Sequence, residues 1–131
     1  MPTASTWDQY NIEDKIRQIL RAVATPLNSP TLGRQFMTTY QIVLEFNRRF
    51  LATVTTLGKP MGGAGTGPDA LTIYFAGELA KRISDGRITD IEMQFLAAQD
   101  IDTMSFLTGG APMIATPHKA SFPNSMFRLR V

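Results

Sequence analysis

Cysteine is absent from the 131 residues, so neither a disulfide nor thiol chemistry contributes to the fold or to a reaction. Histidine occurs once, at position 118, in a loop bounded by prolines, and nothing around it supports a zinc site or a Ser-His-Asp site. We therefore expect no enzyme, no metal and no cofactor.

Long apolar runs are missing as well, and we expect no secretory leader. No run is long enough to cross a membrane, and the N-terminus lacks the basic region and apolar stretch of a secretory signal. We expect a cytoplasmic protein that makes no membrane contact. At 131 residues the chain fits a single domain, residues 1–131, that buries roughly two-thirds of its unfolded surface.

Charge is scarce. Charged residues make up 18% of the chain, below the usual value of about 25%, while apolar residues, among them eight Phe and seven Met, make up 44%. The formal net charge of +2 is too small to argue for nucleic acid by itself. A surface with so few charges fits burial against a partner, and it fits a somewhat hydrophobic monomer equally well.

Acidic residues are missing from the whole segment 103–131, whose three cations are Lys119, Arg128 and Arg130, whereas segment 85–102 holds five acids and one base. The two arginines alternate with apolar residues in the clearest strand pattern of the chain, so they lie on one face about 7 Å apart. With Lys119 they form a candidate contact for a partner. A solvated strand face, or pairing with acids of segment 85–102, explains the same residues.

Four segments have the 3.6-residue period of an amphipathic helix, namely residues 6–25, 34–51, 68–84 and 89–98. The last two meet in a tight corner. Gly86 is expected in the left-handed conformation that ends a helix. Thr89-Asp90-Ile91-Glu92 has the pattern of a capping box that starts the next helix.

The helix expected over residues 34–51 is apolar on more sides than one core contact requires. Ile42 and Phe46 belong to its second apolar face, which needs a partner chain or the C-terminal segment to cover it. We therefore take Ile42 and Phe46 as candidate contacts for self-association. Residues 52–57 fit either a strand or the end of this helix.

From Ile101 onward, strand patterns replace the helical period. Residues 103–106 and 112–116 flank Gly109-Gly110, a two-residue hairpin signal, and residues 127–131 form a further strand. The predicted fold is α+β: a four-helix core, predominantly α, with a small C-terminal antiparallel β meander. Residues 1–5 are expected to be a loose N-terminus and residues 58–67 a mobile Gly-rich loop.

The corner around Gly86 resembles the second half of an EF-hand calcium loop, because Asp85 and Glu92 stand at the spacing of that loop's fifth and twelfth positions. The first and third positions would be Lys81 and Ile83, which cannot ligate calcium. A capped helix corner explains the same residues, and we expect no calcium binding.

The glycine-rich run 62–67 precedes a helix start, where backbone N–H groups favour anions. A phosphate loop needs Gly-Lys-Ser/Thr at that point, and the chain has Gly67-Pro68-Asp69 instead. Because Asp69 would repel phosphate, a flexible connector is the better interpretation.

These features predict a non-catalytic intracellular protein-interaction module that self-associates as a homo-oligomer through its over-apolar helix. The alternative is a winged-helix-like nucleic-acid-binding protein that uses the basic C-terminal strand and the loop around Lys119. The acids of segment 85–102, and the lack of a basic stripe on any predicted helix, count against that alternative.

Overall fold

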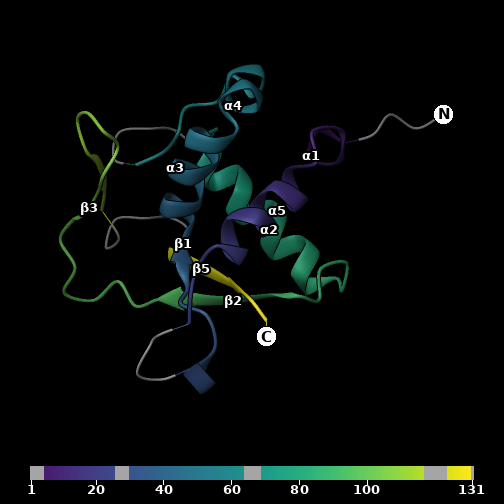
Figure 1. Cartoon of the computed structure of the whole chain (residues 1–131). Coiled ribbons are helices and arrows are strands. Elements are labelled where there is room, and N and C mark those ends of the chain that lie inside the picture. The colour runs from purple at the N-terminus through teal and green to yellow at the C-terminus, as the bar shows by residue number, and fades with distance from the viewer. Residues whose placement is uncertain (1–4, 26–29, 64–68, 117–123, 131) are drawn as a thin grey trace.

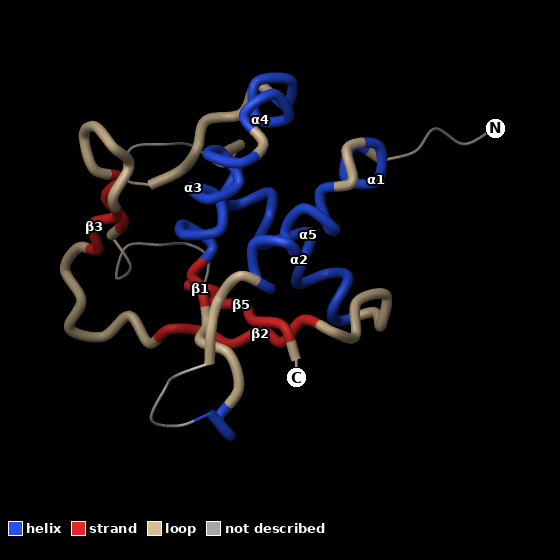
Figure 2. Tube along the Cα trace, viewed as in Figure 1, coloured by secondary structure: helices blue, strands red, loops and turns tan. Residues whose placement is uncertain are grey.

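The computed structural model describes residues 5–25, 30–63, 69–116 and 124–130 (Figures 1 and 2). Its helices are α1 (Thr6–Gln9), α2 (Ile12–Arg21), the 3-10 turn η1 (Pro30–Leu32), α3 (Thr39–Arg49), α4 (Leu51–Leu57) and α5 (Leu71–Ser84). Its strands are β1 (Met37–Thr38), β2 (Ile91–Leu96), β3 (Met104–Phe106), β4 (Met113–Ala115) and β5 (Asn124–Leu129). The α+β class is confirmed. A four-helix core is not, because the described ranges hold five α-helices, four of them seven residues or longer.

The predicted helix over residues 6–25 is two helices. Asn11 between them has a left-handed φ of 51°, which ends α1 and turns the chain into α2. The cap of α1 is Ser5, whose hydroxyl accepts a hydrogen bond from the Asp8 N–H at 3.2 Å. The apolar face of α2 is confirmed, since Ile12 and Ile16 are fully buried.

The predicted helix over residues 34–51 begins later than expected. Thr38 caps α3 in a capping box with Gln41, and Met37 and Thr38 are paired in a strand rather than coiled. The pattern Thr-x-x-Gln was present in the sequence as a start signal. Residues 52–57, which fitted strand or helix, lie in the short helix α4.

The helix predicted over residues 89–98 is wrong, because residues 91–96 form strand β2. The carboxylates of Asp90 and Glu92 pair with Arg17 and Arg128, which are distant in sequence, rather than with N–H groups of a helix start. Gly86 does adopt the expected left-handed conformation after α5, with a φ of 83°.

The C-terminal strand lies in the middle of a sheet, not at the end of a meander. β5 pairs antiparallel with β1 on one side and with β2 on the other, giving the order β1-β5-β2. The predicted strand pair around Gly109-Gly110 is present as β3–β4, with Met104 opposite Ala115. The two-residue turn predicted there is wrong, because residues 107–112 connect the two strands. It forms a separate two-stranded sheet, which stands at the left of Figure 1, away from the three-stranded one.

The core lies between the three-stranded sheet and the helices on one of its faces. α2 and α3 contact β5, and α5 contacts β2 (Figure 1). The largest fully buried side chains are Trp7, Phe46, Phe75, Phe127, Ile12, Ile16, Ile19, Leu20, Ile42, Leu71, Leu79 and Ile91. None of the helices in the described ranges has the length and apolar character needed to span a membrane.

Candidate interaction surface

Ile42 and Phe46, the candidate contacts on the second predicted helix, are in the core of this one chain. Both side chains are 0% exposed, and the Phe46 ring packs edge-on against Phe75 with 4.9 Å between centroids. The second apolar face of α3 is therefore covered by the chain's own elements. Neither side chain reaches a surface that a partner could contact.

Arg128 is engaged within the chain. Its Nε donates to Glu92 at 2.7 Å, one terminal nitrogen donates to the Leu32 carbonyl at 2.8 Å, and the guanidinium lies 4.4 Å from the Phe36 ring centroid. The hydrogen bond from Arg128 lowers the pKa of Glu92 below its ordinary value of 4.5.

Arg130, the second arginine of the pattern, is exposed just beyond the end of β5. Lys119 lies outside the described residues, as does His118. The basic C-terminal face is therefore reduced to one exposed arginine among the candidates that the structure describes.

The backbone of β2 has one satisfied side and one open side. The Arg130 N–H donates to the Asp90 carbonyl at 2.8 Å, so these two residues form a hydrogen-bonded pair of the antiparallel ladder. Such pairs recur at every second residue. Glu92, Gln94 and Leu96 therefore direct their backbone groups to β5, while residues 91, 93 and 95 direct theirs away from it.

The opposite side of β5 gives the same alternation. The Ser125 carbonyl accepts a hydrogen bond from Thr39 Oγ1 at 3.3 Å, on the side of β1 and α3. Odd-numbered residues of β5 therefore face β1, and even-numbered residues face β2. Two independent contacts thus agree on which backbone groups of β2 are outward.

No other strand pairs with this outer side in the part of the chain that the structure describes, and the backbone groups of Ile91, Met93 and Phe95 have no hydrogen bond to another described segment. The Phe95 ring, at the far end of the strand, is 56% exposed. We call the outward backbone of residues 91, 93 and 95, together with the Phe95 side chain, the open edge.

In the described part of the chain, the open edge lacks the usual protection. Exposed edge strands are commonly shortened, bulged or furnished with lysine or proline, which prevents pairing with another chain. β2 runs six residues in continuous register with β5 and contains neither residue type. Its one charge, Glu92, is held by Arg128. The alternation of residues 91–95 was the signal for this strand in the sequence.

A pocket of about 410 Å³ lies between α3, residues 61–62 and the β3–β4 hairpin. Its lining residues are Leu44, Asn47, Arg48, Met61, Gly62, Thr108, Ala111, Pro112, Met113 and Ile114. Arg48 is the charged group of this lining, and it is paired with Glu45 and donates to the Leu107 carbonyl at 2.7 Å. That charge is therefore already compensated within the chain.

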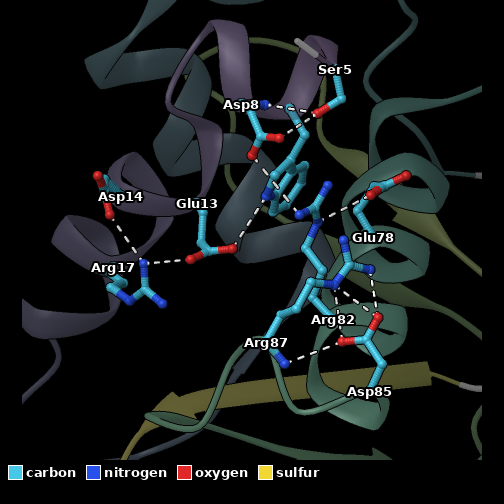
Figure 3. A network of polar contacts seen from close by, with 10 residues as sticks. Ser5, Asp8, Glu13, Asp14, Arg17, Glu78, Arg82, Asp85 and Arg87 are labelled. Carbon is cyan, nitrogen blue, oxygen red and sulfur yellow. Dashed lines mark hydrogen bonds and ion pairs between the residues drawn. The ribbon is translucent and has the colours of Figure 1, made fainter. Parts of the chain in front are cut away.

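A polar network joins α1, α2 and α5 (Figure 3). Arg82 is 8% exposed, its Nε lies 3.2 Å from Glu78, and its guanidinium lies 5.4 Å from the Trp7 ring. Trp7 in turn donates to Glu13 at 3.4 Å, and Glu13 pairs with Arg17 at 2.7 Å. Every charge drawn there has an opposite partner, and the contact of Arg82 with Asp8 joins α5 to α1.

Arg17 extends this network to the sheet, where it binds Asp90 through two hydrogen bonds of 2.8 and 3.0 Å. The same contact lowers the pKa of Asp90. Asp90 directly precedes β2, so Arg17 fixes the start of that strand against α2. Within the described ranges, no group of three or more metal-ligating side chains is gathered in one place.

Comparison of the chain with family models, with curated proteins and with solved structures found no match.

Proposed function

We propose that this chain is a non-catalytic protein-interaction module that accepts an extended segment of another polypeptide along the open edge. The observation that carries the proposal is the row of outward backbone groups at Ile91, Met93 and Phe95 on a six-residue edge strand. Main-chain hydrogen bonds along such an edge supply affinity, and neighbouring side chains supply specificity.

Phe95 supplies apolar area next to those hydrogen bonds. Full burial of a Phe side chain contributes roughly 1.5–3 kcal/mol, and the ring is 56% exposed in the free chain. A bound segment that covers it would gain about half of that value. The edge thus combines a directional backbone contact with one hydrophobic anchor.

Nucleic-acid binding remains the rival function. It depended on a basic C-terminal strand, but Arg128 of that strand is paired with Glu92. Strong non-specific DNA binding uses roughly six to ten phosphate contacts, far more than this strand offers. We expect no binding of duplex DNA at physiological salt. A micromolar or tighter complex that is lost when Arg128 and Arg130 are both changed to Gln would favour the rival instead.

The docking function is tested by selecting linear peptides from a random display library on the full chain. Titration of the ¹⁵N-labelled chain with a selected peptide should shift the amide signals of Ile91, Met93 and Phe95 before the amide signals of other residues. Phe95→Lys should weaken binding by about tenfold or more, because the lysine adds a charge and removes the ring.

Leu51→Lys is the matched control, since Leu51 is 60% exposed on α4, away from β2. It should leave peptide affinity unchanged. Three outcomes would contradict the proposal. The selected peptides could shift other amides, both variants could weaken binding equally, or no peptide could be selected.

A further inference from the structure

We infer that the segment accepted by the open edge is β2 of a second copy of this chain, in antiparallel pairing about a two-fold axis at Met93. This inference rests on the proposed function and names its partner. The pairing would join two three-stranded sheets into one continuous sheet of two copies.

The direction of the backbone groups restricts the register. Two edges can share a hydrogen-bonded ladder only if outward residues of one copy face outward residues of the other. With the axis at Met93, Ile91 faces Phe95 of the other copy and Met93 faces its own counterpart. All three outward residues of each strand are then used.

Charge favours the same register. With the axis at Met93, Glu92 of one copy lies opposite Gln94 of the other. Moving the axis by one residue, to Glu92, would place two carboxylates directly opposite each other, which is destabilising. The formal net charge of +2 per chain adds little general repulsion between copies.

The side chains are also compatible with two-fold pairing. Phe95, which is 56% exposed, would lie at the junction with the other copy, opposite the backbone of its Ile91, whose side chain is buried in that copy's own core. Because a two-fold contact repeats itself, each of the two exposed Phe95 rings would lie against the other copy. In this register the edge thus satisfies its own outward backbone groups and places no like charges opposite each other.

The absence of cysteine makes the register directly testable, because a single introduced cysteine has no competing thiol. Residues paired across an antiparallel ladder have Cα atoms about 4.5–5.5 Å apart, within the range of a disulfide. Under mild oxidation, Met93→Cys should form a covalent dimer. Leu51→Cys, on an exposed site of α4, should remain monomeric under the same conditions.

A mixed pair avoids any loss of packing at Met93. Glu92→Cys and Gln94→Cys should each fail to cross-link alone, because neither residue faces itself in this register. An equimolar mixture of the two should yield the mixed dimer. Cross-linking of Gln94→Cys with itself would contradict the register.

Sedimentation equilibrium of the unmodified chain at about 100 µM tests for the dimer without a chemical cross-link. We expect a dimer whose dissociation constant rises about tenfold or more in Phe95→Lys and stays unchanged in Leu51→Lys. A monomer at this concentration would overturn the second copy as partner. If selected peptides still shifted the amides of β2, the docking function would survive that result, and if they did not, both proposals would fail.

Discussion

The two outer strands of the sheet, β1 and β2, flank the same central strand, yet only one of them is closed. β1 has two residues, and its outward N–H, on Thr38, donates to the Gln41 side chain at 2.7 Å. β2 has six residues, and its outward backbone groups have no partner in the described chain.

The two strands differ in the segment that comes after each of them. β1 runs directly into α3, so the capping box that starts the helix also occupies the N–H that would otherwise be exposed at the sheet edge. β2 runs into residues 97–103, which are not in a helix or strand. A strand edge can thus be closed by a local side chain, without another strand.

The largest expected effect on stability comes from comparing two phenylalanines. Phe46 is buried in the core, and Phe95 is exposed on the open edge. Phe46→Ala should lower the free energy of unfolding by about 3–5 kcal/mol, because its ring is fully buried between α3 and α5. Phe95→Ala should cost about 0.5 kcal/mol or less in the monomer. Denaturant melts at low concentration measure both values, and comparable losses would mean that Phe95 is part of the core.

Proline placed at successive positions of β2 tests which side is open. Gln94→Pro should cost about 3 kcal/mol, because the Gln94 N–H is directed to β5 and the ladder would lose it. Phe95→Pro should cost about 1 kcal/mol, because proline is tolerated where the N–H faces solvent. Urea titrations of both variants measure the two losses in the free energy of unfolding. The reverse order of stability would invert the assignment of the open side.

Removing the side chain that closes the edge at β1 should have a smaller effect on stability. Gln41→Ala removes the acceptor for the Thr38 N–H and should cost about 1 kcal/mol, with faster hydrogen exchange of that amide. Gln41→Glu is the control, since Glu serves equally well in a capping box. If exchange at Thr38 were unchanged in Gln41→Ala, the edge would be closed by something other than this side chain.

The smallest effect concerns the one charge on β2. Arg128 lowers the folded-state pKa of Glu92, so the pair stabilises the fold above the unfolded-state pKa of about 4.5 and is lost as pH falls through the folded value. Glu92→Gln should cost about 0.5 kcal/mol at neutral pH, since the pair is partly exposed. The cost should vanish in thermal melts under strongly acidic conditions. A constant difference at all pH values would assign the effect to packing.

Sequence patterns were sufficient where the partners are local. The apolar face of α2, the left-handed Gly86 and the strand pair around Gly109-Gly110 follow from residues within a few positions of each other. In each case the period or the turn chemistry has one interpretation.

The alternation of residues 91–95 was compatible with a strand, but the choice between strand and capped helix depends on partners that are distant in sequence. Thr89 and Glu92 have the spacing of a capping box, and only the pairing of Asp90 with Arg17 and of Glu92 with Arg128 shows that the segment serves a strand instead. The apolar excess of α3 likewise gave no sign that Phe75 would cover Phe46. Short apolar runs leave helix and strand undecided until such tertiary contacts are known.

The central place of β5 has a consequence for how the chain folds. β1 and β2 are more than fifty residues apart and touch each other nowhere in the ladder, so neither belongs to a sheet until the later strand β5 inserts between them. The hydrogen bonds within each helix are local, so the helices can form early, but the sheet requires long loops to close first. We therefore expect a two-stage refolding reaction, in which helical circular dichroism appears before protection of the β5 amides.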